Sequence, residues 1–369
     1  EPLGAASWAS ALLVIGGCRS TMDSGTFGTW GWRIPFWVSF ILLGFSVYIR
    51  LKLHESPIFK KIKEEGKTSK APLTDSFLRY PNNKYVLLAL IGATAGQGVV
   101  WYTGQFYALF FILIYLKLDF LMTYTLIGLS LVIGTPFFLL FGWLSDRIGR
   151  KKIILAGCLI AALTYFPLFR GLTHYINPAL EQYQQRTPIT VAATDCNFHI
   201  FIGPWSRQTE CDKVKDFLGK SGLSFSSLPS IPGQPPVVTR IGDAQITGWD
   251  EKQFKSVLAS TGYPTKANPA QVNWVMAELI LVVMVIYVTM VYGPIAAFLV
   301  ELFPARIRYT SMSLPYHIGN GWFGGMLPLL ATAMVAKAGN IYYGLWYPIV
   351  VSLGTFIIGA IFVRETRHV

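Results

Sequence analysis

Two long apolar runs, 120–141 and 153–172, lie on either side of a short charged stretch, 142–152. Each run has roughly 20 residues, the length that a helix needs to cross the ~30 Å hydrocarbon core of a bilayer. The stretch between them reads GWLSDRIGRKK and holds one acid and four bases. This pattern predicts two membrane helices joined by a tight charged turn on one membrane face.

The rest of the chain repeats this pattern. Hydrophobic residues make up 53% and charged residues 14% of the sequence, which is typical of an all-α polytopic membrane protein. The net charge of +12 does not indicate a nucleic-acid partner, because the bases lie in short loops beside apolar runs and follow membrane topology. Eight runs are candidate membrane helices: 3–17, 34–51, 85–115, 120–143, 153–172, 272–302, 311–336 and 342–363.

Basic residues gather in alternate loops. The stretch 50–84 holds nine Lys or Arg residues, and bases recur at 147–152 and 306–308. The loops between these contain fewer, such as the lone Lys117 and Lys337. By the positive-inside rule the basic loops are cytoplasmic, so the other loops are predicted to lie outside the cytoplasm.

One of the outer loops, 173–270, is long, polar and rich in Pro, Gly and Ser. A structureless loop of this size is uncommon in a folded protein. Within it, 235–249 predicts two short strands around a Gly-Asp turn, while 210–218 and 250–260 predict helical turns. We expect a small α+β extracytoplasmic insertion.

The four cysteines divide by environment. Cys18 and Cys158 fall in apolar runs, where a small packing residue is the expected role, and Cys196 and Cys211 fall in the outer insertion. A structural disulfide between the second pair suits an oxidising compartment. A redox role is the alternative, but redox cysteines are usually spaced as CxxC, and this spacing is absent from the sequence.

The charged turn has an ordered pattern that topology alone does not require. The sequence GWLSDRIGRKK resembles the signature loop of the major facilitator superfamily, between helices two and three and again between helices eight and nine. The resemblance implies a cytoplasmic latch made by Asp146, Arg147 and Arg150. There the acid caps a helix and the bases bind acids at other helix ends.

A second motif, ELFPARIR at 301–308, ends another apolar run on the same predicted side. It resembles the acidic-Pro-basic signature that follows helix ten in that superfamily, with Glu301 and Arg308 at its ends. We predict that Glu301 pairs with Arg147 or Arg150 when the carrier faces outward, and separates from it when the inner gate opens. The alternative is an ordinary surface ion pair.

Further segments resemble one particular family within this superfamily. WGWRIPF at 30–36, LHESPIF at 53–59 and RETRH at 364–368 are similar to stretches of the metabolite:proton symporter family. The resemblance implies an incomplete major facilitator fold with helices five to twelve, so we expect the chain to lack about four N-terminal helices. The expected divisions are 1–52, the last two helices of the N-terminal bundle; 53–84, a cytoplasmic central loop; 85–172, the first three helices of the C-terminal bundle; 173–270, the extracytoplasmic insertion; and 271–369, the last three helices and tail.

Polar side chains inside apolar helices are the candidates for substrate contact. The run 85–115 offers Gln97, Tyr102 and Gln105 among glycines that would allow a bend; the alternative is tight helix packing with Tyr as an interfacial anchor. The run 311–336 offers His317 and Asn320, which share a helix face with Tyr316. His317 could carry a proton, or simply hydrogen-bond within the bundle.

Two charged residues, Glu278 and Arg33, lie near the starts of apolar runs. Glu278 follows Pro269 by about two turns, so an interfacial position is the simpler reading. Arg33 immediately precedes an apolar run, where it could be a snorkelling anchor or an anion contact.

These features favour a secondary active transporter that couples proton entry to uptake of a small polar metabolite, an organic acid or osmolyte, by alternating access. A uniporter or exchanger of the same fold is one alternative, and a membrane-tethered sensor using 173–270 is another. The sequence has no nucleotide-binding loop, metal-ligand spacing or nucleophile–base pair, so we expect neither enzyme activity nor a cofactor or metal. The expected form is a monomer in a bacterial inner membrane with a periplasmic 173–270 insertion.

Overall fold

The computed structural model describes residues 13–52, 57–66, 69–200, 205–229 and 237–366. In this part of the chain seven helices are long and apolar enough to cross a membrane. The predicted polytopic helical fold is therefore confirmed, while the run 3–17 falls mostly outside the described residues. The seven spans are Gly31–Ile49, Asn82–Tyr115, Phe120–Ile148, Arg150–Ile176, Trp274–Leu302, Arg308–Ala338 and Tyr343–Phe362.

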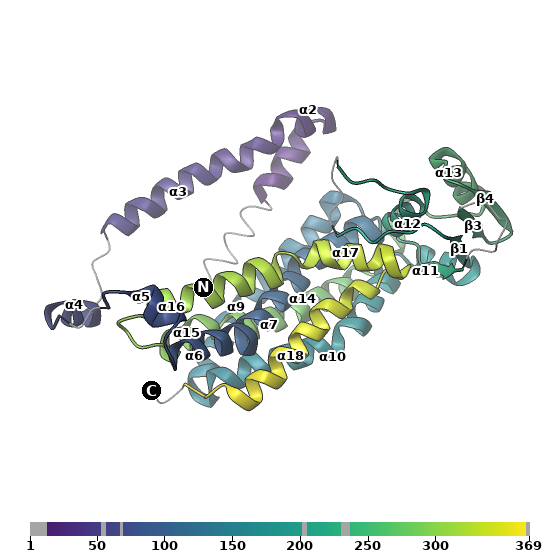
Figure 1. Cartoon of the computed structure of the whole chain (residues 1–369). Coiled ribbons are helices and arrows are strands. Elements are labelled where there is room, and N and C mark those ends of the chain that lie inside the picture. The colour runs from purple at the N-terminus through teal and green to yellow at the C-terminus, as the bar shows by residue number, and fades with distance from the viewer. Residues whose placement is uncertain (1–12, 53–56, 67–68, 201–204, 230–236, 367–369) are drawn as a thin grey trace.

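The first span stands apart from the other six, as Figure 1 shows for α3. None of its most apolar window is buried, and large side chains such as Phe36 and Phe40 are exposed. A helix that is apolar on every side is suited to a lipid environment. The elements up to the bundle are α2 (Ser24–Thr29), η1 (Gly31–Arg33), α3 (Ile34–Lys52), α4 (Pro57–Glu64) and α5 (Pro72–Phe77).

The second span, Asn82–Tyr115, is one helix interrupted by wide π-helical turns. Such turns occur often at functional sites, because they change the direction of side chains within a continuous helix. The segments of this span are α6 (Asn82–Ala89), η2 (Leu90–Thr94, π), α7 (Ala95–Tyr102), η3 (Thr103–Tyr107, π), α8 (Ala108–Phe110) and η4 (Phe111–Tyr115, π).

The remaining spans pack into a bundle with α7, in which α14 contacts both α9 and α10 and α18 contacts α10 (Figure 1). Side-chain caps fix where two of them start: Asp119 accepts from the Leu121 amide and Asn273 from the Met276 amide. The elements are α9 (Phe120–Ile148), α10 (Arg150–Ile176), α14 (Trp274–Tyr292), α15 (Ile295–Leu302), α16 (Arg308–Ile318), η6 (Gly319–Gly324, π), α17 (Leu327–Ala338), η7 (Tyr343–Leu345) and α18 (Trp346–Phe362).

The turn between α9 and α10 has fewer residues than the sequence indicates. Helix α9 continues through Asp146 and Arg147, and α10 already begins at Arg150, so Gly149 alone separates them. Gly149 has φ +115°, a conformation that side-chain-bearing residues rarely adopt. Most of the charged stretch is therefore helical. Its charged residues belong to the ends of α9 and α10 rather than to a loop.

Between α10 and α14 the chain forms a small α+β unit at one end of the bundle (Figure 1), as expected for this segment. Its four-stranded sheet has the order β2-β1-β3-β4, with β1 parallel to β2 and antiparallel to β3. Strands β3 and β4 form the predicted hairpin around Gly242 and Asp243. The elements are α11 (Pro178–Arg186), β1 (Ile189–Ala193), α12 (Glu210–Lys220), β2 (Ser226–Leu228), β3 (Val237–Ile241), β4 (Ala244–Thr247), α13 (Glu251–Ser260) and η5 (Pro269–Gln271).

Hydrogen bonds join the α+β unit directly to the helix ends below it. The Phe225 amide donates to the Gly339 carbonyl at 2.7 Å, and the Ala267 amide donates to the Lys117 carbonyl at 3.1 Å. The buried Asn177 side chain donates to the Leu116 carbonyl at 2.9 Å. The unit is thus built onto the bundle at two separate loops.

Candidate functional site

Two polar clusters lie in the bundle, and the first surrounds Arg150 at the start of α10. Its guanidinium donates through Nε to both carboxylate oxygens of Glu301 at 2.8 Å, and Nη2 lies 2.7 Å from Glu301 Oε1. Nη1 lies 2.7 Å from Asp146 Oδ1. The Arg150 and Glu301 side chains are only 16% and 24% exposed, so this bidentate pair is largely shielded from solvent.

The C-terminal segment completes this first cluster. Glu365 Oε1 accepts from the backbone amides of Arg150 at 2.9 Å and Lys151 at 3.3 Å, which places a carboxylate at the N-terminus of α10. The Thr366 hydroxyl donates to Glu301 at 2.7 Å. We call Asp146, Arg150, Glu301, Glu365 and Thr366 the loop cluster.

Other basic residues of the motifs lie nearby but are differently engaged. Arg147 lies over the Trp143 ring at 4.2 Å, and Arg308 donates to the Phe303 carbonyl at 3.1 Å. Lys151 donates to the Ala360 and Val363 carbonyls at the end of α18. Of the two bases predicted for Glu301, the structure brings Arg150 to it, and the pair joins α10 to α15.

The second cluster lies where α7 crosses η6. The Gln97 side chain donates to Asn320 Oδ1 at 3.0 Å, and Asn320 donates back to Gln97 Oε1 at 3.1 Å. Asn320 also donates to the Tyr316 carbonyl at 3.0 Å. The hydroxyls of Tyr316 and Tyr292 are 3.0 Å apart. We call Gln97, Asn320, Tyr316 and Tyr292 the amide cluster.

Glycines allow the two helices to approach closely enough for this contact. A Cβ on Gly98 would overlap the Gly319 carbonyl, and one on Gly319 would lie 2.7 Å from the Thr94 carbonyl. Thr94 uses the same close approach to donate its hydroxyl to the Pro315 carbonyl at 2.8 Å. Small residues at a helix crossing let the backbones meet, and here they also bring the two amides together.

Aromatic side chains extend the amide cluster along α7. The Trp101 ring stacks on Tyr292 at 5.9 Å, and Tyr102 stacks on Phe106 at 4.9 Å. Tyr102 is partly exposed, as is Asn320, whereas Gln97 is fully buried. The cluster can therefore offer amide and phenol hydrogen-bonding groups beside aromatic rings, a combination suited to a small polar ligand.

The other predicted contact residues make no hydrogen bond to the paired amides in the described part of the chain. Gln105 is 2% exposed, and its Oε1 has no hydrogen-bond partner among the described residues. His317 is exposed next to the Tyr316 ring. Arg33 donates to the Thr29 carbonyl at 2.7 Å and lies over Trp32, so these contacts stay within its own segment. The structure thus brings together Gln97 and Asn320, but does not bring Arg33 to them.

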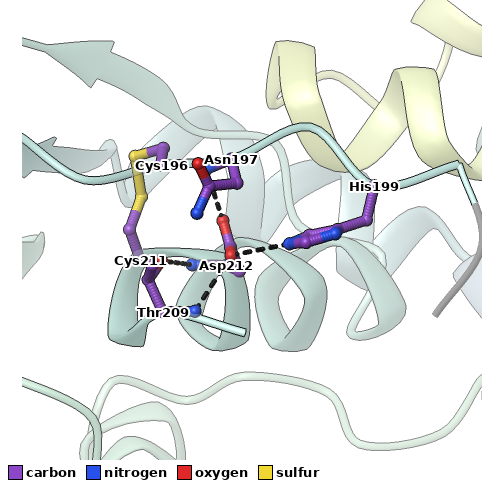
Figure 2. Close-up of a disulfide and its surroundings, with 6 residues drawn as sticks. All are labelled: Cys196, Asn197, His199, Thr209, Cys211 and Asp212. Carbon is purple, nitrogen blue, oxygen red and sulfur yellow. Dashed lines mark hydrogen bonds and ion pairs between the residues drawn. A yellow bond between two sulfur atoms is a disulfide. The ribbon is translucent and has the colours of Figure 1, made fainter. Parts of the chain in front are cut away.

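In the α+β unit, Cys196 and Cys211 form a disulfide, with the side chains around it drawn in Figure 2. Asp212 next to it accepts from the Asn197 amide at 2.7 Å, the Thr209 amide at 2.9 Å and the His199 ring at 3.0 Å. Burial raises the pKa of Asp212, but these hydrogen bonds outweigh burial and hold the pKa below its usual value. The acid therefore stays charged and fastens the disulfide loop to the start of α12.

Sequence reasoning missed one acid of the loop cluster, Glu365. Glu365 was seen only as part of the C-terminal stretch, although an acid shortly after the last apolar run is a signal for a helix-capping partner. Glu278 was expected at the interface. In the structure both of its carboxylate oxygens are buried, and neither has a hydrogen-bond partner in the described part of the chain.

Comparison with known proteins gives these features a family context. The family model described as Major Facilitator Superfamily matches residues 5–173. The shikimate transporter of Escherichia coli (strain K12) is 30% identical over 151 residues, which is 40% of this chain and 33% of the relative. The inner membrane metabolite transport protein YhjE of the same organism is 22% identical over 355 residues, 93% of this chain and 56% of the relative.

These alignments span between about a third and about half of the length of the two relatives. No solved structure matches the chain. The family match and the transporter relatives agree with the signature motif around Asp146 and with a bundle of apolar helices. They indicate a multi-pass membrane protein that is similar to transporters. Over residues 5–173 the chain is similar to the major facilitator superfamily.

Proposed function

We propose that the chain is part of a secondary active transporter that carries a small polar metabolite, an organic acid or an osmolyte, together with protons. The WGWRIPF motif and the named relatives support placing it in the metabolite:proton symporter family. In this proposal the protein is a monomer in a bacterial inner membrane, and the α+β unit faces the periplasm.

The observation that carries the proposal is the reciprocal Gln97–Asn320 amide pair within otherwise apolar helices. A polar pair at this depth is costly unless its hydrogen-bonding capacity is used. Both N–H donors of Asn320 are used, by Gln97 and by the Tyr316 carbonyl, but the side-chain oxygen of this partly exposed residue keeps a second lone pair. A substrate that donates a hydrogen bond can bind to this Asn320 oxygen without disrupting the pair.

Uptake into proteoliposomes that contain the chain tests this function. We expect radiolabelled shikimate or proline to enter, and Gln97→Leu or Asn320→Leu to reduce uptake by about tenfold or more, the effect of losing one good hydrogen bond in a buried site. Gln185→Leu, at an exposed position on α11, is the matched control and should leave uptake unchanged. Equal uptake by all these variants would place the substrate elsewhere.

Proton coupling needs a side chain that gains and loses a proton during the cycle. Glu278 is our candidate, because its two oxygens are buried in α14 without a donor from the described residues. The alternative from the sequence, His317, is exposed. A buried acid without a partner is the stronger candidate for a group that takes up a proton.

The proton test compares two modes of transport in the same vesicles. We expect Glu278→Gln to abolish accumulation driven by a pH gradient while leaving exchange of labelled for unlabelled substrate intact. Loss of both modes would assign Glu278 a structural role. If the unmodified chain shows no acidification with uptake, it is a uniporter or exchanger.

A membrane-tethered sensor is the alternative from another class. The hydrogen bonds from Phe225 to Gly339 and from Ala267 to Lys117 favour a unit that moves with the bundle rather than an independent receptor. Transport that persists when the α+β unit is replaced by a short linker would support a carrier in which the unit is accessory. Ligand binding by this unit without any transport would support the sensor.

A further inference from the structure

A cavity in the described part of the α+β unit lies between α12 and α13 and reaches the loop that follows η4. Its volume is about 750 Å³, within the range of small-molecule sites. Helix α12 contributes Lys213, Phe217 and Lys220, the N-terminal end of α13 contributes Trp249 and Glu251, and the loop contributes Lys117. The cavity therefore bridges the unit and the end of a membrane span.

Lys117 is held in an unusual backbone conformation at this junction. Its φ is +58°, and it is the sole non-glycine residue with positive φ in the described ranges. A lysine gains nothing intrinsically from this conformation, which is mainly adopted by Gly, Asn and Asp. The Lys117 carbonyl accepts from the Ala267 amide at 3.1 Å, so a contact with the α+β unit holds the strained residue in place.

The side chain of Lys117 is partly buried, and no acid in the described part of the chain pairs with it. Burial lowers the pKa of its ammonium group, because the charged form has lost part of its hydration. A carboxylate ligand would supply the missing counter-charge. The local structure thus places a partly dehydrated cation at the wall of an open cavity.

The other charges of the cavity leave it positive. Lys220 pairs with Asp216 at 2.7 Å, and Lys255 pairs with Glu251 at 2.6 Å, so these four residues are close to neutral together. Lys213 on the same wall has no such pair among the described acids. Lys117 and Lys213 are therefore the two uncompensated charges.

Aromatic rings form the apolar part of the wall. Phe217 and Trp249 pack edge to face with ring centroids 5.5 Å apart. The Tyr263 hydroxyl donates to the Ser221 carbonyl at 2.6 Å, which fixes its ring. Because all three rings line the cavity and are only partly buried, they can stack against a flat or cyclic ligand.

We propose that this cavity binds a small ring-bearing carboxylate, with Lys117 and Lys213 on the carboxylate and Phe217, Trp249 and Tyr263 around the ring. The site is separate from the amide cluster and does not depend on the transport proposed for the chain. Through Lys117, a bound ligand would contact the loop that ends the Asn82–Tyr115 span.

Benzoate is the probe, with benzamide as its uncharged counterpart. Equilibrium binding of radiolabelled benzoate to the chain in lipid nanodiscs is measured without any gradient, so the result is independent of transport. We expect saturable binding of benzoate that benzamide does not displace. Lys117→Gln and Lys213→Gln should each weaken it about tenfold, as expected for loss of a charge-assisted hydrogen bond.

Lys252→Gln is the matched control, because Lys252 is an exposed lysine of α13 that does not line the cavity. This variant should bind benzoate within about twofold of the unmodified chain, as expected for a surface charge. Absence of saturable binding, equal weakening by Lys252→Gln, or displacement by benzamide would each overturn the proposal. Binding that is lost in Gln97→Leu but kept in Lys117→Gln would also overturn it, since the ligand would then occupy the amide cluster.

Discussion

The loop cluster and the amide cluster both join distant segments of the bundle, the first through charged groups and the second through neutral groups. The loop cluster uses full charges, with Arg150 shared between Glu301 and Asp146. The amide cluster joins Gln97 to Asn320 through neutral groups alone. Both connect segments far apart in the sequence, since Arg150 and Glu301 are 151 residues apart and Gln97 and Asn320 are 223 residues apart.

The two clusters use different groups because they lie at different positions along the helices. The loop cluster is at helix ends, where α9 stops and α10 begins, and free backbone amides there add to the binding of Glu365. The amide cluster lies within spans, where an ionised side chain is far more expensive than a hydrogen-bonded amide. Charged groups therefore hold the end of the bundle together, and neutral groups hold the helix crossing inside it.

The strongest way to break the amide cluster is to separate its helices at Gly98. We expect Gly98→Val to abolish transport and to destabilise the bundle by about 3 kcal/mol, because overpacking at a closed crossing forces the backbones apart. The added side chain would overlap the Gly319 carbonyl. Thermal unfolding in nanodiscs and uptake in proteoliposomes measure the two effects.

Gly128→Val in α9 is the control for this change. A Cβ at Gly128 would meet no atom within 4 Å beyond the backbone of its own helix and its two chain neighbours, so this variant should unfold and transport like the unmodified chain. If both variants behave alike, helix propensity rather than the Gly98–Gly319 contact explains the loss.

The second prediction tests the ion pair between Arg150 and Glu301 in the loop cluster. We expect Glu301→Ala to lower stability by about 2 kcal/mol, since it leaves the shielded Arg150 with the exposed Asp146 as its remaining acid. The exchange Arg150→Glu with Glu301→Arg should recover part of the stability and transport lost in each single variant. Unfolding and uptake of the three variants measure this recovery.

Arg147→Gln serves as the control for the pair, because Arg147 lies on Trp143 rather than on a carboxylate. Its effect should be below about 1 kcal/mol, the usual value for an exposed cation on a ring. Recovery of stability without recovery of transport in the exchanged variant would make the Arg150–Glu301 pair a fixed connection between α10 and α15 and remove its predicted role as a gate.

The sequence was sufficient for the elements with a strong local signal. Apolar run length predicted the spans, and the Gly-Asp turn predicted the β3–β4 hairpin. It could not place β1 beside β2, because that parallel pairing depends on the long connection through α12. It also named Gln97 and Asn320 separately without joining them, since the contact depends on how closely α7 and η6 pack.

A subtler test of the amide cluster asks whether its two members act as a unit. Each of Gln97→Leu and Asn320→Leu should cost about 1.5 kcal/mol, mostly because the remaining amide stays buried without its partner. The double variant should cost less than the sum of the two single variants, since no amide is then left unsatisfied. Additive losses in thermal unfolding would show that the amides contribute independently, and the cluster would not be a unit.

The smallest effect is expected at Glu365, where the charge at the N-terminus of α10 can be tested alone. Glu365→Gln keeps a side-chain oxygen near the Arg150 and Lys151 amides but removes its charge, so stability should fall by about 0.5–1 kcal/mol, the range of a charge at a helix N-terminus. Added salt should shrink this difference. Glu251→Gln, in an exposed pair on α13, should change stability by less, and an equal loss in both variants would mean that the α10 N-terminus contributes nothing beyond an ordinary surface charge.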